Sequence, residues 1–237
     1  MKYEISGENF PVVTIHLDTG ESVYTQTGGM SWMTSGIAMK TNIKGGLIKA
    51  MERKLTGESF FMTTYTAKHD KQFIAFASSF PGNIVPLDLN SGSYICQKHA
   101  FLCAQPGVKL SALVPNKLKA VIFGGEGIFM QKLSGHGYAF LEIDGSVKKI
   151  NLAAGEKLIV NVGNVAAYES GVRFSAQMIK GVRNILFGGE GLFVPTLEGP
   201  GKVYLQTMTL PTFVKRIVPF LPKPEPDKSQ AGHQKHN

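Results

Sequence analysis

Three glutamates recur in a phrase that the chain repeats, and they are the first side chains whose spacing suggests shared chemistry. Each copy sets a Gly-Glu pair between apolar residues, and the pairs are Gly57–Glu58, Gly125–Glu126 and Gly189–Glu190. The glutamates lie 68 and then 64 residues apart, so the phrase marks an internal repeat. A carboxylate in every copy favours a structural role, in which it accepts backbone N–H bonds across a turn or pairs between subunits. The alternative is a ring of equivalent carboxylates that binds cations or basic partners.

The glycines around these glutamates do not match a known phosphate-binding loop. Phe123–Gly127 fits neither the Gly-x-x-x-x-Gly-Lys-Ser/Thr pattern nor a Gly-x-Gly-x-x-Gly that opens a helix. Glycine also supplies the positive φ or the close backbone approach that a turn or bulge needs. The phrase therefore indicates a turn.

Cys96, His99 and Cys103 are the closest grouping of metal-binding residue types. A Cys and a His three residues apart on an extended strand point to opposite faces, so the spacing favours buried thiols over a metal site. No two histidines of the folded part stand two residues apart on a strand, no Gly-x-Ser-x-Gly elbow occurs, and neither cysteine carries a nucleophile signature. The sequence predicts no catalytic residue, metal ligand or cofactor, although a triad assembled only in space stays an alternative.

A second repeated phrase shows which elements must position these residues. Its copies share a central glycine followed by an apolar run, and they are Leu17–Val23, Leu89–Ile95 and Leu152–Leu158. The glycines are 72 and then 63 residues apart, in step with the first phrase. Three diverged copies of one β-rich unit account for both periods.

Composition agrees with many short strands joined by tight turns. The chain has 237 residues, 27 of them glycine, and only 18% are charged. We expect a single domain over 1–221, built of repeats at about 1–80, 81–144 and 145–210 plus a short C-terminal helix. The fold class is all-β, with one or two short helices.

Local patterns place the individual elements. Strands are expected at 12–17, 22–26 and 37–43, and hairpins where apolar runs flank turn residues, at 61–77, 129–143 and 193–207. Residues 47–55 have the best helical pattern within the repeats, and 211–218 suggest a short amphipathic helix that opens with proline. Residues 222–237 are rich in proline and basic residues, and we expect this tail to be disordered.

The formal charge of +8 is uneven, because the C-terminal end is basic. The ordinary explanation of such an end is a solvated tail. The more specific explanation is that it binds nucleic acid or an anionic membrane. RNA readout needs exposed aromatics among Lys and Arg, whereas most phenylalanines here stand in alternating apolar runs typical of a core. Nucleic acid is therefore a disfavoured partner.

Membrane contact has a better basis in the two expected helices. Each offers a small apolar face beside basic residues, as interfacial helices do. Candidates for interface or membrane contact are Trp32, Leu47, Ile48, Met51, Phe213 and Ile217. The start of the sequence lacks a signal-like apolar stretch, and no run has the length of a membrane span. We expect a cytoplasmic protein, with a position peripheral to the membrane as a further possibility.

Several motifs in order resemble one known family. The three Gly-Glu phrases, Gly28–Met33 and Gly45–Phe61 are similar to the mitochondrial biogenesis family named for altered inheritance of mitochondria, over about 1–210, and the chain looks like a bacterial member. The resemblance implies short double-stranded β-helix units like those of the tryptophan RNA-binding attenuator protein, triplicated in one chain. It also implies closure into trimers, and its mitochondrial branch is associated with inner-membrane organisation. It supplies no catalytic residues.

Taken together, the residues and the resemblance predict a non-enzymatic homotrimeric ring that serves as a scaffold or binding module. Its partners would be copies of itself and a membrane surface or another protein. One alternative is a small-molecule or metal-dependent enzyme of the double-stranded β-helix class. The other is an RNA-binding ring, suggested only by fold analogy.

Overall fold

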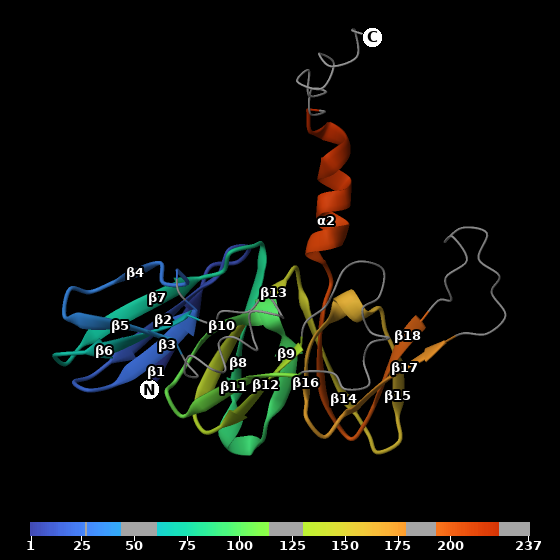
Figure 1. The fold of residues 1–237 in the computed structure, drawn as a ribbon, viewed down its shortest axis with the longest axis horizontal. Coiled ribbons are helices and arrows are strands. Elements are labelled where there is room, and N and C mark those ends of the chain that lie inside the picture. Colours follow the sequence, from blue (N-terminus) through green and yellow to red (C-terminus); the bar gives the residue numbers. More distant parts are fainter. Residues whose placement is uncertain (27, 44–60, 114–129, 179–192, 223–237) are drawn as a thin grey trace, which may run out of the picture.

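The computed structural model describes residues 1–26, 28–43, 61–113, 130–178 and 193–222, and it is predominantly β (Figure 1). Its strands are β1 (Lys2–Ser6), β2 (Val12–Leu17), β3 (Ser22–Gln26), β4 (Trp32–Met33), β5 (Ile37–Ile43), β6 (Phe61–Ala67), β7 (Gln72–Ala77), β8 (Gly82–Asp88), β9 (Tyr94–Gln97), β10 (Phe101–Ala104), β11 (Val108–Ala112), β12 (Met130–Gly135), β13 (Tyr138–Asp144), β14 (Val147–Leu152), β15 (Lys157–Ile159), β16 (Val165–Glu169), β17 (Arg173–Met178), β18 (Phe193–Glu198) and β19 (Gly201–Gln206). Among the described residues one α-helix, α2 (Leu210–Ile217), follows the last of these strands.

Among the described residues the strands form four sheets; β5, β6 and β3 of the second sheet lie at the same end of the molecule as the first sheet, and the last sheet lies at the other end (Figure 1). The strand orders of the four sheets are β1-β2-β7-β4, β5-β6-β3-β10-β13-β8, β11-β12-β9-β16-β19-β14 and β15-β18-β17. Every pairing among the described strands is antiparallel. The two six-stranded sheets therefore combine strands from sequence regions that lie far apart.

Strand β2 illustrates why these segments become strands. Val13, Ile15 and Leu17 are at most 1% exposed, while Thr14 and His16 between them face outward. This period of two is what a half-buried strand requires. Each large apolar side chain that is fully buried contributes roughly 1.5–3 kcal/mol through the hydrophobic effect.

Glycine turns join the strands where the repeated phrase predicts them. Gly20 and Gly155 have φ of +84° and +77°, a region that side chains with a Cβ seldom adopt. In each of these two turns a carboxylate accepts a backbone N–H three residues earlier: Glu21 from Asp18 at 2.9 Å and Glu156 from Ala153 at 2.8 Å.

Most elements expected from local patterns are confirmed. Strands β2, β3 and β5 lie where expected, and the C-terminal helix is α2. The three predicted hairpins are wrong: their strands are present, but β6 and β7, β12 and β13, and β18 and β19 belong to different sheets, because each strand pairs with strands farther away in the sequence. The helix expected at 47–55 lies outside the described residues, as do the Gly-Glu phrases and the tail from residue 223 onward.

The segment from Cys96 to Cys103 differs from the extended strand assumed for it. Lys98–Ala100 form a 3-10 turn, closed by a hydrogen bond from the Phe101 N–H to the Lys98 carbonyl. The turn places Cys96 on β9 and Cys103 on β10, in different sheets. Both thiols are free and buried, as expected.

The core is shared between neighbouring sheets. One buried cluster joins Tyr24 of β3 to Leu133 of β12 and Ala167 of β16, and a second joins Val13 of β2 to Phe140 of β13. A third cluster lies around Leu197 of β18. Because apolar contacts cross from one sheet to the next, the sheets pack as one body.

Candidate functional site

Two sheets end in short strands that carry exposed apolar residues. Among the described strands, β4 pairs only with β7 and β15 pairs only with β18. Trp32 on β4 is 51% exposed and Ile159 on β15 is 70% exposed. An unpaired edge presents free N–H and C=O groups that can pair with another strand. These two edges are therefore the candidate site.

Strand β4 is held firmly on its inner side. Trp32 lies opposite Ala75 and Met33 opposite Ile74 on β7. At the end of the strand, the Thr34 N–H donates to the Phe73 carbonyl at 3.0 Å. The Thr34 hydroxyl in turn accepts the Phe73 N–H at 3.2 Å. The outer side of β4 is thus positioned without any strand beside it in the described chain.

Strand β15 is held in a similar way at the other end of the molecule. Leu158 lies opposite Leu197 and Ile159 opposite Thr196 on β18. The Val160 N–H extends this pairing with a 3.1 Å hydrogen bond to the Pro195 carbonyl. Edge strands are commonly protected by charges, yet this one ends in an exposed isoleucine.

Two junctions inside the chain show what pairing does to such edges. Strand β3 pairs with β10 through Tyr24 and Ala104, which are 1% and 0% exposed. The Tyr24 hydroxyl donates to the Val108 carbonyl at 2.9 Å. Burial, reinforced by nearby Cys103, raises the pKa of Tyr24, so its phenol stays neutral. This junction is apolar and closed to solvent.

The second junction, between β9 and β16, adds a charged group at its rim. Ile95 lies opposite Tyr168, and Tyr94 opposite Glu169. The Glu169 carboxylate accepts the Lys202 N–H at 2.9 Å and lies 3.1 Å from the Lys202 ammonium. Burial opposes ionisation of Glu169, but these hydrogen bonds and the Lys202 charge outweigh it and lower the pKa of the carboxyl.

The buried cysteines belong to these junctions. Cys103 on β10 is close to Tyr24, and Cys96 on β9 lies directly opposite Ala167 on β16. Burial raises the pKa of Cys96 to about 12 and raises that of Cys103 as well. A thiolate is the reactive form of cysteine, so these thiols pack as apolar groups at neutral pH.

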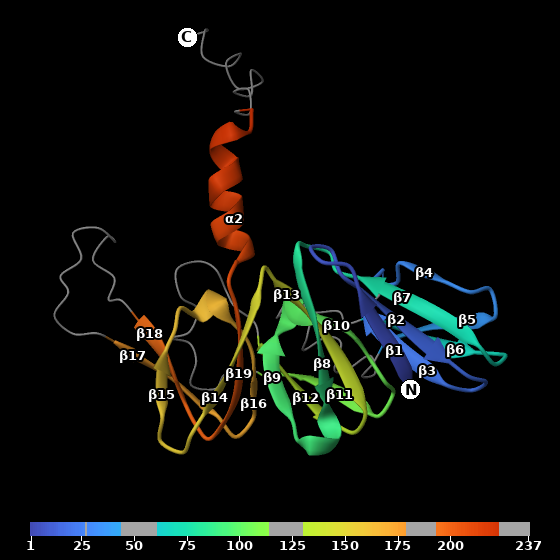
Figure 2. The same cartoon turned by 180° about the vertical axis from the view of Figure 1, so that it is seen from behind.

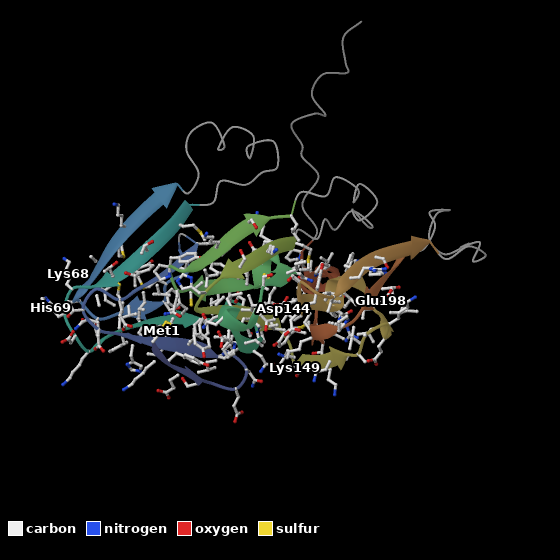
Figure 3. The ribbon with its side chains drawn as sticks, turned by 90° about the horizontal axis from the view of Figure 1, so that it is seen from below. Met1, Lys68, His69, Asp144, Lys149 and Glu198 are labelled. Atoms are coloured by element: carbon white, nitrogen blue, oxygen red, sulfur yellow. The ribbon has the colours of Figure 1, made fainter. Side chains whose placement is uncertain are left out.

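Other titratable side chains are spread along the molecule. Figure 3 places Lys68 and His69 at the outer end of the N-terminal sheets, Asp144 near the middle and Glu198 toward the far end. Within the described ranges, no group of three or more His, Cys, Asp or Glu could hold a metal ion. No helix among the same residues is long and apolar enough to cross a bilayer.

The candidate contact residues from the sequence lie on separate elements. Trp32 is on β4, whereas Phe213 and Ile217 are on α2, which projects from the middle of the molecule (Figure 1). The structure does not bring these three together. The remaining candidates lie outside the described residues: Leu47, Ile48, Met51, Gly57, Glu58, Gly125, Glu126, Gly189 and Glu190.

Ile159 was missed by sequence reasoning, although a signal for it exists. It follows the third copy of the glycine phrase as Tyr24 follows the first. Strand β10 pairs with β3 at Tyr24, whereas β15 pairs only with β18 among the described strands. Alignment of the copies could therefore have singled out Ile159 as an edge residue.

Comparisons with known proteins agree with the β-rich architecture. Residues 3–208 match the family described as Mitochondrial biogenesis AIM24. An uncharacterized protein of Streptococcus pyogenes serotype M6 is 31% identical over 220 residues, covering 90% of this chain and 88% of that protein. A crystal structure of a Streptococcus pyogenes protein has a TM-score of 0.74 at 28% identity, and the match covers 93% of this chain and 99% of that one. The chain belongs to the mitochondrial biogenesis AIM24 family.

Proposed function

We propose that the protein is a non-enzymatic scaffold that joins copies of itself head to tail, through β15 of one chain and β4 of the next, into a homotrimeric ring. The observation that carries this proposal is that the sheets at the two ends of the chain are complementary halves. One end offers β17-β18-β15, and the other offers β4-β7-β2-β1.

A recurring pairing pattern supports this interpretation. Three successive groups of six strands, β2–β7, β8–β13 and β14–β19, have the same internal connections. In each group the sixth strand pairs with the first and third, and the fifth with the second and fourth. Identical connections in all three groups are what a triplicated unit requires.

The connections between groups indicate which strands the proposed contact between copies would join. The second strand of the first group pairs with the third strand of the next, as β3–β10, and the same rule gives β9–β16. By that rule the second strand of the last group, β15, needs the third strand of a further group. The corresponding strand of the first group is β4, which has an open outer edge.

Strand register predicts which residues would meet. Equivalent residues of the three groups can be identified from their pairing with the fifth strand. In each group one residue of the second strand lies opposite a buried residue of the fifth strand, and the residue after it is Tyr24, Ile95 or Ile159. Met33, Ala104 and Tyr168 occupy equivalent places opposite the sixth strand. Because Tyr24 pairs with Ala104 and Ile95 with Tyr168, we expect Ile159 to pair with Met33, and Val160 to lie opposite Trp32.

Burial at the internal junctions gives the contact its driving force. Cys103 and Ala167, the equivalents of Trp32, are both 0% exposed. Covering Trp32 and Ile159 would remove two large apolar side chains from water, worth roughly 1.5–3 kcal/mol for each one fully buried. Such a head-to-tail contact is heterologous, and it closes into a ring when the rotation between copies allows. Three is the number of chains that the family resemblance implies.

Native mass spectrometry of the full chain tests the proposal. We expect the mass of three chains at micromolar concentration, and a monomer for the edge variant Ile159→Asp. Met39→Asp is the matched control, because Met39 is 58% exposed on β5, which pairs with β6 in a sheet that contains neither β4 nor β15. A wild-type monomer, or an Ile159→Asp protein with the wild-type mass, would contradict the proposal. No described observation favours the enzymatic or the RNA-binding alternative.

A further inference from the structure

Helix α2 leaves the sheets with an almost unpartnered surface. It begins after Thr209, whose hydroxyl accepts the Thr212 N–H at 3.3 Å, and Pro211 stands in its first turn. A 3-10 turn, Val218–Phe220, extends it. Neither segment contains a buried residue, and both views show it extending away from the strands (Figures 1 and 2). The helix is therefore formed locally and presented outward.

Its exposed apolar residues fall on one side. Leu210, Val214, Ile217 and Leu221 stand at intervals of four, three and four, the spacing of one helical face. We call these residues, with Val218 and Phe220, the α2 face; their exposures run from 38% at Ile217 to 86% at Phe220. A contiguous exposed apolar patch of this kind marks an interaction surface.

One aromatic contact fixes the base of the helix. The Phe213 ring packs edge-on against Phe80, with 5.0 Å between ring centroids. Phe80 lies in the β7–β8 connection, and Gly82, the first residue of β8, donates its N–H to the Asn9 carbonyl in the β1–β2 turn at 2.8 Å. The next residue, Phe10, is 64% exposed. The helix base is thus anchored, while the α2 face and Phe10 stay open.

The charges beside the α2 face have one sign. Lys215 and Arg216 are exposed on the helix, and neither the helix nor the 3-10 turn contains an acidic residue. The sequence beyond them adds three lysines against Glu225 and Asp227. A short helix with an apolar stripe and flanking cations matches the surface of a bilayer that contains anionic lipids.

We propose that the α2 face lies in the headgroup region of an anionic lipid bilayer and holds the protein at the membrane surface. Within the α2 face, exposure is greatest at Phe220, which lies beyond the Phe80 contact and away from the sheets. A bilayer can cover the end of this helix because lipids adapt to the shape of a protein surface. The contact between copies proposed above uses β4 and β15 instead. Only the expected strength of membrane binding rests on the proposed function, because a ring presents one helix per chain and binds the bilayer by avidity.

Vesicle flotation of the full chain tests this inference. We expect the protein to float with vesicles of phosphatidylcholine and phosphatidylglycerol, and much less with phosphatidylcholine alone. The double variant Ile217→Asp, Phe220→Asp should lower the bound fraction at least about tenfold, because it removes apolar contact and adds repulsion. Both side chains are exposed, so its melting temperature should match that of wild type. Met39→Asp, an equal change on β5, should float like wild type. Lys215→Gln with Arg216→Gln should reduce the preference for phosphatidylglycerol.

The results separate this inference from the proposed ring. Failure of the wild-type protein to float with phosphatidylglycerol vesicles overturns it, as does undiminished flotation of the Ile217→Asp, Phe220→Asp variant. If that variant loses the trimer mass in the absence of lipid, the α2 face covers a second copy and the inference is also overturned. A monomeric wild-type protein that floats would support the inference and refute the ring. A trimer that does not float would do the reverse.

Discussion

Replacing Ile159 by Asp should disassemble the protein without unfolding it. Ile159 is 70% exposed in the single chain, so it adds little to the fold, whereas its equivalent at the first junction, Tyr24, is 1% exposed. Most of the roughly 1.5–3 kcal/mol gained by burying such a side chain would thus be lost at each contact between chains. That loss alone weakens a contact about tenfold to one-hundredfold, and a carboxylate against an apolar edge weakens it further.

The single tryptophan provides the assay. Trp32 is 51% exposed on β4, and it would be covered when β15 of another chain pairs there. The assembled wild-type protein should show blue-shifted emission and weak quenching by acrylamide, and Ile159→Asp should shift the emission to the red and restore quenching. Far-ultraviolet circular dichroism and the melting of Met39→Asp control for folding. Equal quenching in the wild type and in Ile159→Asp would refute the reasoning.

Three further predictions concern the stability of the chain itself. Glu169→Gln should destabilise the protein by only about 0.5–1 kcal/mol at neutral pH, since solvent screens part of the pairing between Glu169 and Lys202. Folding lowers the pKa of Glu169 from its ordinary 4.5, so the stabilisation is present above pH 4.5 and is lost as the pH falls through the folded pKa. The stabilities of wild type and variant should therefore converge in an acid titration. Cys96 and Cys103 should resist iodoacetamide at neutral pH and react only in denaturant, as burial raises the pKa of both; modification of the native protein would contradict this. Phe140→Ala should cost about 3–5 kcal/mol in urea unfolding, because Phe140 is 0% exposed, whereas Phe220→Ala, at 86% exposed, should stay within about 0.5 kcal/mol; comparable losses would be inconsistent with the described core.

Local pattern was sufficient for much of the fold. The alternation of Val12–Leu17 predicts a half-buried strand, and the glycine phrase predicts the positive φ at Gly20 and Gly155. The C-terminal helix was also predictable, since a proline start and apolar residues three and four apart are properties of the segment alone. These features depend on residues near one another in sequence.

Features that depend on distant strands were harder to predict. Ile159 and Tyr24 occupy equivalent positions after the glycine phrase, yet one is exposed and the other buried, because only Tyr24 has a paired strand on that side. Strand β4 has just two residues, too few for periodicity to reveal it. The 3-10 turn at Lys98–Ala100 interrupts an apolar run that otherwise suggests one strand. The candidate site is therefore defined by pairing, and the sequence alone supplied only Trp32.

A register-specific cross-link tests the central claim most directly. Residues directly opposite on neighbouring antiparallel strands have Cβ atoms about 4.5–5.5 Å apart, close enough for an engineered disulfide. The double variant Met33→Cys, Ile159→Cys should form disulfide bonds between chains under mild oxidation. The native thiols of Cys96 and Cys103 should not interfere, because both are buried. The account predicts covalent dimers and trimers of the double variant on a non-reducing gel, and no trimer from either single variant. A double variant that keeps a three-chain mass but yields only monomers on the gel would contradict pairing of β15 with β4.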